Sequence, residues 1–149
     1  MKKSLFSVLM VLITTISTQD LRAQIYKGLP PNAKTYITKH FYGYNICHYE
    51  KDQEILDIEH KIYINNNSGS TFKLKFDKAG QIRVITSKDD ELSFPTSVLP
   101  IKILQYLKRN YHNSNIIEWE KKKNSQHIEL DNGIELIFNS NGDFLRIDD

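Results

Sequence analysis

Hydrophobic and polar positions follow one another along this 149-residue chain with two periods, and each period occurs twice. In the stretches 33–41 and 103–111, apolar and aromatic residues recur every three or four positions, as they do on the buried side of a helix. After each stretch the spacing falls to two, which is typical of a half-buried strand. The pattern predicts an α+β protein in which a helix followed by strands occurs twice.

The repetition extends to individual residues. Leu29–Lys51 aligns without a gap with Leu99–Lys121, 70 positions later, and seven of the 23 pairs are identical. Both copies begin with Leu-Pro, and proline suits the first helical turn because its missing N–H is not needed there. Gly43 and Asn113-Ser114-Asn115 are expected to end the two helices. A unit of roughly 60 residues buries too little surface alone, so we expect the copies to share one sheet or one core.

Four antiparallel strands are expected after each helix. They lie around Cys47–Glu50, Leu56–Ile64, Phe72–Phe76 and Ile82–Ile85 in the first copy, and around Ile117–Glu120, His127–Leu130, Ile134–Phe138 and Phe144–Ile147 in the second. Asp131-Asn132-Gly133 predicts a tight type I′ hairpin, because Asn-Gly tolerates the positive φ that this turn requires. The repeats then span about 29–85 and 99–148. In the linker 86–98, Phe94-Pro95 is either a short helical turn or a packing brace.

Strand alternation directs a set of largely polar side chains away from the apolar side of the sheet. The set comprises His48, Glu50, Asp57, Glu59, Lys61, Tyr63, Lys73, Lys75, Arg83, Glu118, Glu120, His127, Glu129, Glu135 and Ile137. One interpretation is a solvated face whose cross-strand ion pairs each contribute little. The other is a protein-binding surface in which Tyr63 is an anchor, since aromatic residues dominate binding hot spots.

The loop Asn65–Ser70 is a second candidate, either as a hairpin tip that enters a partner's cleft or as a tolerated insertion. If the face and this loop bind a partner, the sequence offers eleven candidate contact residues. They are His48, Glu50, Asp57, Glu59, Lys61, Tyr63, Asn66, Asn67, Lys73, Glu118 and Glu129.

The N-terminus is typical of a secretory signal. Lys2 and Lys3 precede an apolar run at 5–13 that is too short for a stable membrane anchor. We expect cleavage after Ala23, which makes 1–23 a signal peptide and 24–149 a single periplasmic or secreted domain; an uncleaved anchor is the alternative. Without 1–23, basic residues fall from 20 to 17 and acidic residues from 18 to 17. A neutral chain argues against nucleic acid and against capture on an anionic membrane.

Residues that could perform chemistry are sparse. Cys47 is the single cysteine, so it forms no internal disulfide, and its alignment with Ile117 predicts a small core residue rather than a catalytic thiol. The histidines at 40, 48, 60, 112 and 127 lack the spacing of metal ligands, and His40 is expected to be packed or hydrogen-bonded on its helix. Asn139–Asp143 looks like the start of a calcium loop, but the chain ends before the required glutamate, so we predict a hairpin turn.

No nucleophile elbow, phosphate loop, dinucleotide fingerprint or cysteine pair is present in the sequence. The many carboxylates sit on alternating strand positions, and no feature of the sequence sets two of them across a pocket. We therefore predict that the protein is not an enzyme, that it has no catalytic residues and no metal site, and that it needs no cofactor.

Several of these segments resemble the PepSY-like family, whose members are also described as β-lactamase-inhibitor-like and are abundant as exported proteins of Bacteroidetes. The resemblance rests on the Leu-Pro-x5-Tyr helix, the Asn-Ile strand start, Asp-Asn-Gly-Ile-Glu-Leu-Ile-Phe at 131–138 and the closing residues 141–149. It covers nearly all of the exported chain and is closer in the second copy. It implies two layers, in which the helices pack on one face of an antiparallel sheet of about eight strands and the other face stays open.

The combined interpretation is an exported, non-enzymatic protein-binding module. Its partner would be another periplasmic or surface protein, such as a hydrolase that it inhibits or regulates. A structural or stress-related envelope protein is one alternative, and a carrier of a small ligand or metal is another.

Overall fold

The computed structural model describes residues 27–53, 57–89 and 94–148. It forms an α+β fold with two helices and one open antiparallel sheet of eight strands. The first half contains α2 (Pro31–His40), β1 (Asn45–Gln53), β2 (Ile58–Asn65), β3 (Thr71–Phe76) and β4 (Ile82–Ser87). The single 3-10 turn η1 (Thr96–Val98) precedes the second half, which contains α3 (Ile101–Asn110), β5 (Ile116–Lys121), β6 (Ser125–Leu130), β7 (Glu135–Asn139) and β8 (Phe144–Asp148).

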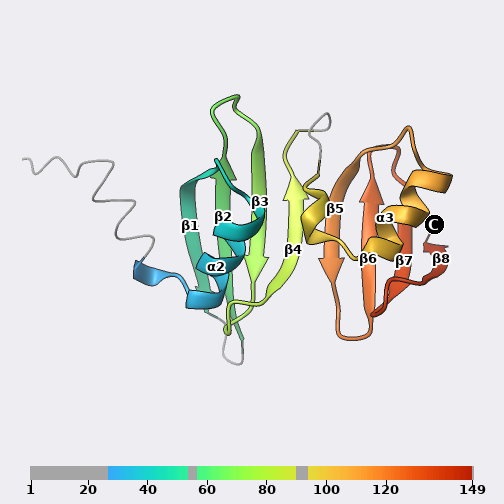
Figure 1. The fold of residues 1–149 in the computed structure, drawn as a ribbon. Coiled ribbons are helices and arrows are strands. Elements are labelled where there is room, and N and C mark those ends of the chain that lie inside the picture. Colours follow the sequence, from blue (N-terminus) through green and yellow to red (C-terminus); the bar gives the residue numbers. More distant parts are fainter. Residues whose placement is uncertain (1–26, 54–56, 90–93, 149) are drawn as a thin grey trace, which may run out of the picture.

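The strands are hydrogen-bonded in the order of the sequence, from β1 at one edge to β8 at the other (Figure 1). The two halves join where β4 pairs with β5, with Ile85 opposite Trp119. This pairing makes one continuous sheet. From the small size of each copy we expected either one sheet or one core, and the two halves share both.

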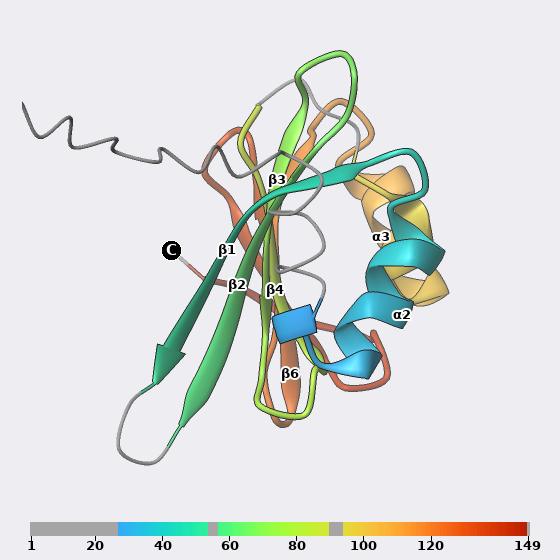
Figure 2. The same cartoon turned by 90° about the vertical axis from the view of Figure 1, so that its left-hand side faces the viewer.

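Both helices lie on the same side of the sheet (Figure 2). Their apolar positions are buried as the periodicity predicted: Ala33 and Ile37 on α2, and Ile103 and Leu107 on α3, belong to one hydrophobic cluster with the sheet. The Leu-Pro prolines differ slightly from expectation, because Pro30 and Pro100 are N-caps that precede the first helical turn.

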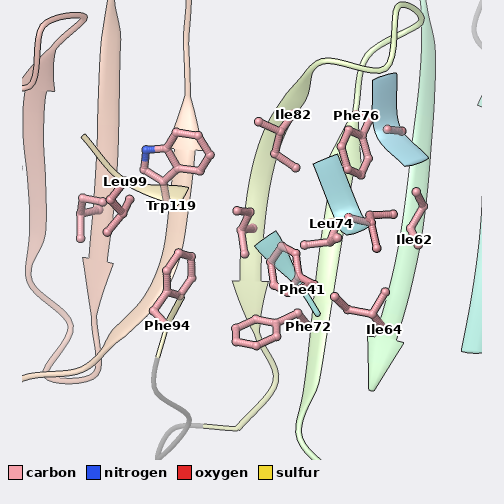
Figure 3. Packing of buried hydrophobic residues seen from close by; sticks show 14 of the residues in the cluster. Phe41, Ile62, Ile64, Phe72, Leu74, Phe76, Ile82, Phe94, Leu99 and Trp119 are labelled. Atoms are coloured by element: carbon pink, nitrogen blue, oxygen red, sulfur yellow. The ribbon is translucent and has the colours of Figure 1, made fainter. Parts of the chain in front are cut away.

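The core runs across both halves beneath the helices (Figure 3). Phe72 is fully buried and contacts Phe41 and Phe94 edge to face, with ring centroids 5.4 and 5.8 Å apart. Each buried aromatic or branched aliphatic side chain stabilises the fold by about 1.5–3 kcal/mol. Phe94 is therefore a packing brace, and η1 provides a helical turn directly after it, so both alternatives for this segment occur.

A β-bulge occurs at the same place in each half. It lies between Ile46 and His48 in β1 and between Ile116 and Glu118 in β5. The extra residue of β1 is Cys47, which is exposed and donates its thiol to the carbonyl of Tyr63 at 3.3 Å. The prediction that Cys47 lies in the core is therefore wrong, because strict alternation does not survive a bulge. Ile46 takes the core position instead.

The turn after β6 also differs from the expected type I′, which needs positive φ at two residues. Of its residues only Gly133 has positive φ, at 81°, and its N–H donates to the carbonyl of Leu130 at 2.9 Å. The Asn132 side chain bonds the N–H of Ile134 instead of placing Asn132 in the left-handed region. Asn139–Gly142 closes in the same way, with Gly142 N–H donating to Asn139 O, which confirms the predicted hairpin turn there.

Candidate functional site: the uncovered face of the sheet

The side of the sheet away from α2 and α3 is covered by no helix or strand of the described residues (Figure 2). We call it the open face. Strand register places on it His48, Glu50 and Asp52 from β1, Glu59, Lys61 and Tyr63 from β2, Lys73 and Lys75 from β3, Val84 and Thr86 from β4, Glu118 and Glu120 from β5, His127 and Glu129 from β6, Glu135 and Ile137 from β7, and Arg146 and Asp148 from β8.

One line of direct cross-strand neighbours crosses the whole open face, and we call it the central row. It runs His48, Tyr63, Lys73, Thr86, Glu118, Glu129, Glu135 and Asp148 from β1 to β8. Five of the eleven candidate contact residues belong to it. The sequence placed them on one face, and the register shows that they form a single line.

The second half of the central row consists of four carboxylates in succession, Glu118, Glu129, Glu135 and Asp148, which we call the carboxylate row. Like charges directly opposite one another on a sheet destabilise it. Thr86 donates its hydroxyl to Glu118 at 2.7 Å, and Arg146 pairs with Asp148 at 3.2 Å. A local rule of sheet design is thus broken along one line, which is expected at a functional surface.

The first half of the open face is balanced in charge. The Lys61 ammonium bonds the carboxylate of Asp52 and lies 3.6 Å from Glu59, which also contacts Lys75 at 3.6 Å. The hydrogen bond to Asp52 raises the pKa of Lys61. Asp52, Asp57, Glu59 and Lys61 line a shallow depression of about 230 Å³.

Lys73 differs from Lys61 and Lys75 in its charge partners. No carboxylate of the described residues pairs with it within 4.0 Å, and it stands between Tyr63 and Thr86 in the central row. Partial burial and the nearby charges of Lys75 and Lys88 lower its pKa. Next to it, the rings of Tyr63 and His48 lie 5.5 Å apart, and His48 bonds Glu50 at 2.9 Å. A cation and an aromatic ring are therefore adjacent at the start of the row.

The remaining candidates serve local structure. The carboxylate of Asp57 accepts the N–H of Ile58 at 2.8 Å at the start of β2. Asn66 holds its own turn, because its side-chain oxygen accepts the N–H groups of Ser68 and Ser70 at 3.0 Å. Arg83 pairs with Asp77 at 3.1 Å beside the β3–β4 turn. Asn67 is exposed at the loop tip, away from the central row.

Sequence reasoning missed one hydrogen-bonded chain beside the carboxylate row. Ser125 Oγ lies 3.2 Å from His127 Nε2, and His127 Nδ1 lies 2.6 Å from Glu135 Oε1. Ser125 and His127 are two positions apart on β6 and therefore share one face of the strand, and this spacing is the sequence signal that could have indicated the chain. Ser125, His127 and Glu135 follow one another in the order of a nucleophile, a general base and a carboxylate that orients the base. The surrounding depression of about 240 Å³ is lined by Glu118, Glu120, His127, Glu129 and Glu135, so an oxyanion would form among like charges.

Within 27–53, 57–89 and 94–148, no group of three or more His, Cys, Asp or Glu side chains is arranged to hold a metal ion. His40, half-buried as expected on its helix, bonds Ser97 Oγ through Nδ1 at 3.0 Å, and burial lowers its pKa.

An open antiparallel sheet with two helices on one side and a largely polar opposite face defines a two-layer α+β protein. The chain belongs to the PepSY-like family, whose model is described as "Putative beta-lactamase-inhibitor-like, PepSY-like" and matches twice, over residues 20–84 and 73–146. The resemblance stated from the sequence is therefore confirmed. No protein in a search of curated proteins matches significantly.

Solved structures with the same fold come from Bacteroides. A periplasmic protein of unknown function from Bacteroides vulgatus is 24% identical, with a TM-score of 0.72 over 83% of this chain and 94% of that one. A protein from Bacteroides thetaiotaomicron, described as "a putative calcium-regulated periplasmic protein", is 23% identical, with a TM-score of 0.72 over 83% and 92%. A second Bacteroides vulgatus periplasmic protein is 25% identical, with a TM-score of 0.69 over 83% and 92%.

All three neighbours are described as periplasmic, which agrees with the predicted periplasmic or secreted location. Among the residues that the structure describes, no helix is long and apolar enough to cross a membrane. The predicted signal segment 1–23 and Leu56 of the predicted second strand lie outside the described residues.

Proposed function

We propose that this protein is a non-enzymatic binding module of the periplasm, and that its open face engages a basic surface of another protein. The carboxylate row carries the proposal. Four consecutive carboxylates stand opposite one another across the strands, and like charges in this position are unfavourable. Lysine or arginine side chains of a partner would remove this repulsion and form charge-assisted hydrogen bonds.

The first half of the central row would add specificity to this contact. Tyr63 supplies a half-buried ring, and Lys73 supplies a cation without a carboxylate partner among the described residues. A partner that offers a carboxylate opposite Lys73 and basic groups opposite the carboxylate row would match both halves. A hydrolase inhibited or regulated in this way is one partner that the family description suggests.

The test is capture from periplasmic extract, using protein purified from the periplasm after expression of the full chain. Bound proteins are identified by mass spectrometry, and affinity is then measured for any enriched partner. The double variant Glu118→Gln/Glu129→Gln should weaken binding at least tenfold, and Tyr63→Ala should weaken it as well. Asp131→Asn is the matched control, since it removes an exposed carboxylate at the β6–β7 turn, outside the row. Equal affinity of all four proteins would contradict the proposal.

The absence of enzymatic activity is part of the same proposal. The Ser125–His127–Glu135 chain lies among carboxylates that would repel a developing oxyanion. Hydrolysis of p-nitrophenyl acetate should therefore proceed at the same rate with the wild type and with Ser125→Ala. A serine-dependent rate would show that the protein is a hydrolase.

A divalent-cation carrier is the second candidate, because one neighbour of the same fold is described as calcium-regulated. The described carboxylates of the row are not arranged to hold a metal ion, so such a carrier would have to bring them together on binding. Calcium titration by calorimetry separates the two functions. If the wild type releases or absorbs heat on binding calcium and the variant Glu118→Gln/Glu129→Gln does not, the carrier is favoured. No heat, together with loss of a protein partner in the same variant, favours the binding module. A protein with neither a partner nor a bound ion would be assigned to the structural role.

We also infer that the two halves are structural repeats within one domain, each helix lying over its own four strands. Equivalent bulges support this organisation, as do the Gly80 and Gly142 turns that approach α2 and α3. The same proposal places the signal peptide at 1–23 and the domain at 24–149. Intact mass of the exported protein tests the boundary, because it should correspond to a chain that begins at Gln24.

A further inference from the structure

The two edge strands of the sheet are protected to different degrees. At one edge, β1 contains the bulge around Cys47 and ends in Lys51, Asp52 and Gln53, which are exposed. Bulges and exposed charges are the devices by which proteins prevent further strand pairing. This edge therefore discourages an additional strand.

At the other edge, β8 (Phe144–Asp148) is exposed at every position. It also contains a bulge, at Leu145, but Arg146, Ile147 and Asp148 keep a regular register with β7. Among the described residues, five large hydrophobic side chains are exposed, and three of them lie on this strand: Leu145 at 54%, Ile147 at 44% and Phe144 at 36%. The ring of Tyr106 on α3 stacks on Phe144 at 4.5 Å but leaves Leu145 and Ile147 uncovered. An exposed apolar edge strand is a template for strand addition.

We propose that the strand added at this edge is β8 of a second copy, paired antiparallel about Ile147. Arg146 and Asp148 both lie on the open face, since they stand opposite Ile137 and Glu135 of β7. An antiparallel pair centred on Ile147 places each Arg146 opposite the Asp148 of the other copy, twice by symmetry. The strand is thus complementary in charge to itself in this register.

The same charges disfavour the neighbouring register. Centring the pair on Arg146 would set two guanidinium groups directly opposite each other, and like charges in that position repel. Offsetting one strand by a single residue, so that Arg146 stands opposite Ile147, would instead bring an open-face and a helix-side position together. Arg146 and Asp148 therefore select one alignment.

The resulting contact is isologous, and a two-fold axis passes between the paired strands. Arg146, Ile147 and Asp148 of each β8 are then paired, and the β1 edges with their bulges and charges lie at the far ends of the joined sheet. Growth stops at two copies, because the regular part of β8 is paired and the β1 edge discourages an additional strand. A short ladder of this kind buries little area, so we expect a dimer that dissociates on dilution.

Analytical ultracentrifugation over a wide concentration range tests the proposal, using the wild type and two single charge reversals purified from the periplasm after expression of the full chain. The wild type should dimerise with concentration. Arg146→Asp and Asp148→Arg should each remain monomeric, because each variant places like charges opposite each other. An equimolar mixture of the two variants should form a heterodimer, because every carboxylate of one variant then faces a guanidinium of the other.

Two further variants make the result specific to the edge. Ile147→Lys should be monomeric, and Lys51→Glu on the β1 edge should dimerise like the wild type; thermal unfolding checks that all variants fold. A wild type that stays monomeric up to millimolar concentration would overturn the proposal. Single reversals that dimerise normally, or a mixture that fails to form the heterodimer, would overturn the Ile147-centred register. The capture experiment varies Tyr63, Glu118 and Glu129, none of which lies on β8, so its failure leaves this test unaffected.

Discussion

Beneath the helices, the two halves of the sheet place different side chains at equivalent positions. In the first half, Tyr49 Oη and His60 Nδ1 share a hydrogen bond of 2.8 Å between β1 and β2. In the second half, Trp119 Nε1 donates to Gln126 Oε1 at 3.1 Å between β5 and β6. His60 stands opposite Phe76, and Gln126 stands opposite Phe138, which shows that the positions correspond.

Each half meets the same physical requirement, which is a hydrogen-bond partner for a polar side chain buried under the helix. His60 and Gln126 are buried at 5% and 3% exposure, and a buried polar group without a partner costs about 1–3 kcal/mol. A large aromatic residue on the neighbouring strand supplies both the partner atom and apolar contact. The pair in the second half lies next to the seam with β4, whereas the pair in the first half lies at the edge of the sheet.

The largest expected effect comes from removing the aromatic member of each pair. Trp119 is 3% exposed and stands opposite Ile85 at the seam, so Trp119→Ala leaves a cavity and removes the donor to Gln126 Oε1. We expect it to lower the free energy of unfolding by about 3–5 kcal/mol. Tyr49 is half-buried at the edge, so Tyr49→Ala should cost about 1–2 kcal/mol. Urea unfolding measures both, and equal losses would contradict the distinction between seam and edge.

The turns beneath the helices give a smaller contrast. Gly80 and Gly142 have φ of 76° and 84°, a region in which a residue with a Cβ loses about 1–2 kcal/mol. A Cβ on Gly80 would lie 2.8 Å from Pro30 Cβ and 2.9 Å from the Ala33 nitrogen, whereas one on Gly142 would meet Lys102 and Pro100 at 3.3 Å.

Gly80→Ala should therefore add about 1–3 kcal/mol of overpacking to the backbone cost, and Gly142→Ala should show little beyond that cost. Gly133→Ala is the control, because its φ is 81° but a Cβ would meet no atom within 4 Å. The expected order of midpoints in urea is Gly133→Ala and Gly142→Ala close together and Gly80→Ala lowest. A Gly80→Ala midpoint as high as that of Gly133→Ala would show that α2 moves away from the turn without cost.

These elements also show what a sequence can predict. The helices were predicted at their observed positions because Ile37 and Leu107 belong to strong periodic stripes that packing reinforces. The core position of Cys47 was predicted wrongly because a bulge is a property of strand pairing, and alternation carries no sign of it. The type I′ turn failed because the Asn132 side chain bonds the backbone in a different turn.

The candidate site was predictable to the same extent. Alternation placed Tyr63, Lys73, Glu118 and Glu129 on one face. Their alignment in the central row depends on the register between strands, which the bulges and the unequal hairpins set. The pairing of β4 with β5, which makes the row continuous, joins residues more than 30 positions apart, for example Thr86 and Glu118. A single sequence carries no signal for that pairing.

The smallest expected effect concerns pH and again separates the two buried pairs, because only the first contains a group that titrates near neutrality. Burial lowers the pKa of His60, the charge of Lys51 on β1 lowers it further, and Asp77 after β3 partly offsets both. The unfolded chain therefore takes up a proton before the folded one does. The stability that depends on neutral His60 is fully present above about pH 6.5. It is lost as the pH falls below that value toward the lowered pKa of His60.

His60→Gln installs the side chain that the second half uses, so its stability should fall less between pH 7.5 and pH 5 than that of the wild type. Some slope should remain in both proteins, because burial also lowers the pKa of His40. His112→Gln is the matched control, since it removes an exposed histidine outside the core and should keep the wild-type profile. Urea midpoints at several pH values measure the effect. If His60→Gln and the wild type lose stability in parallel, the protonation of His60 is not coupled to folding, and the two buried pairs are equivalent in acid as well.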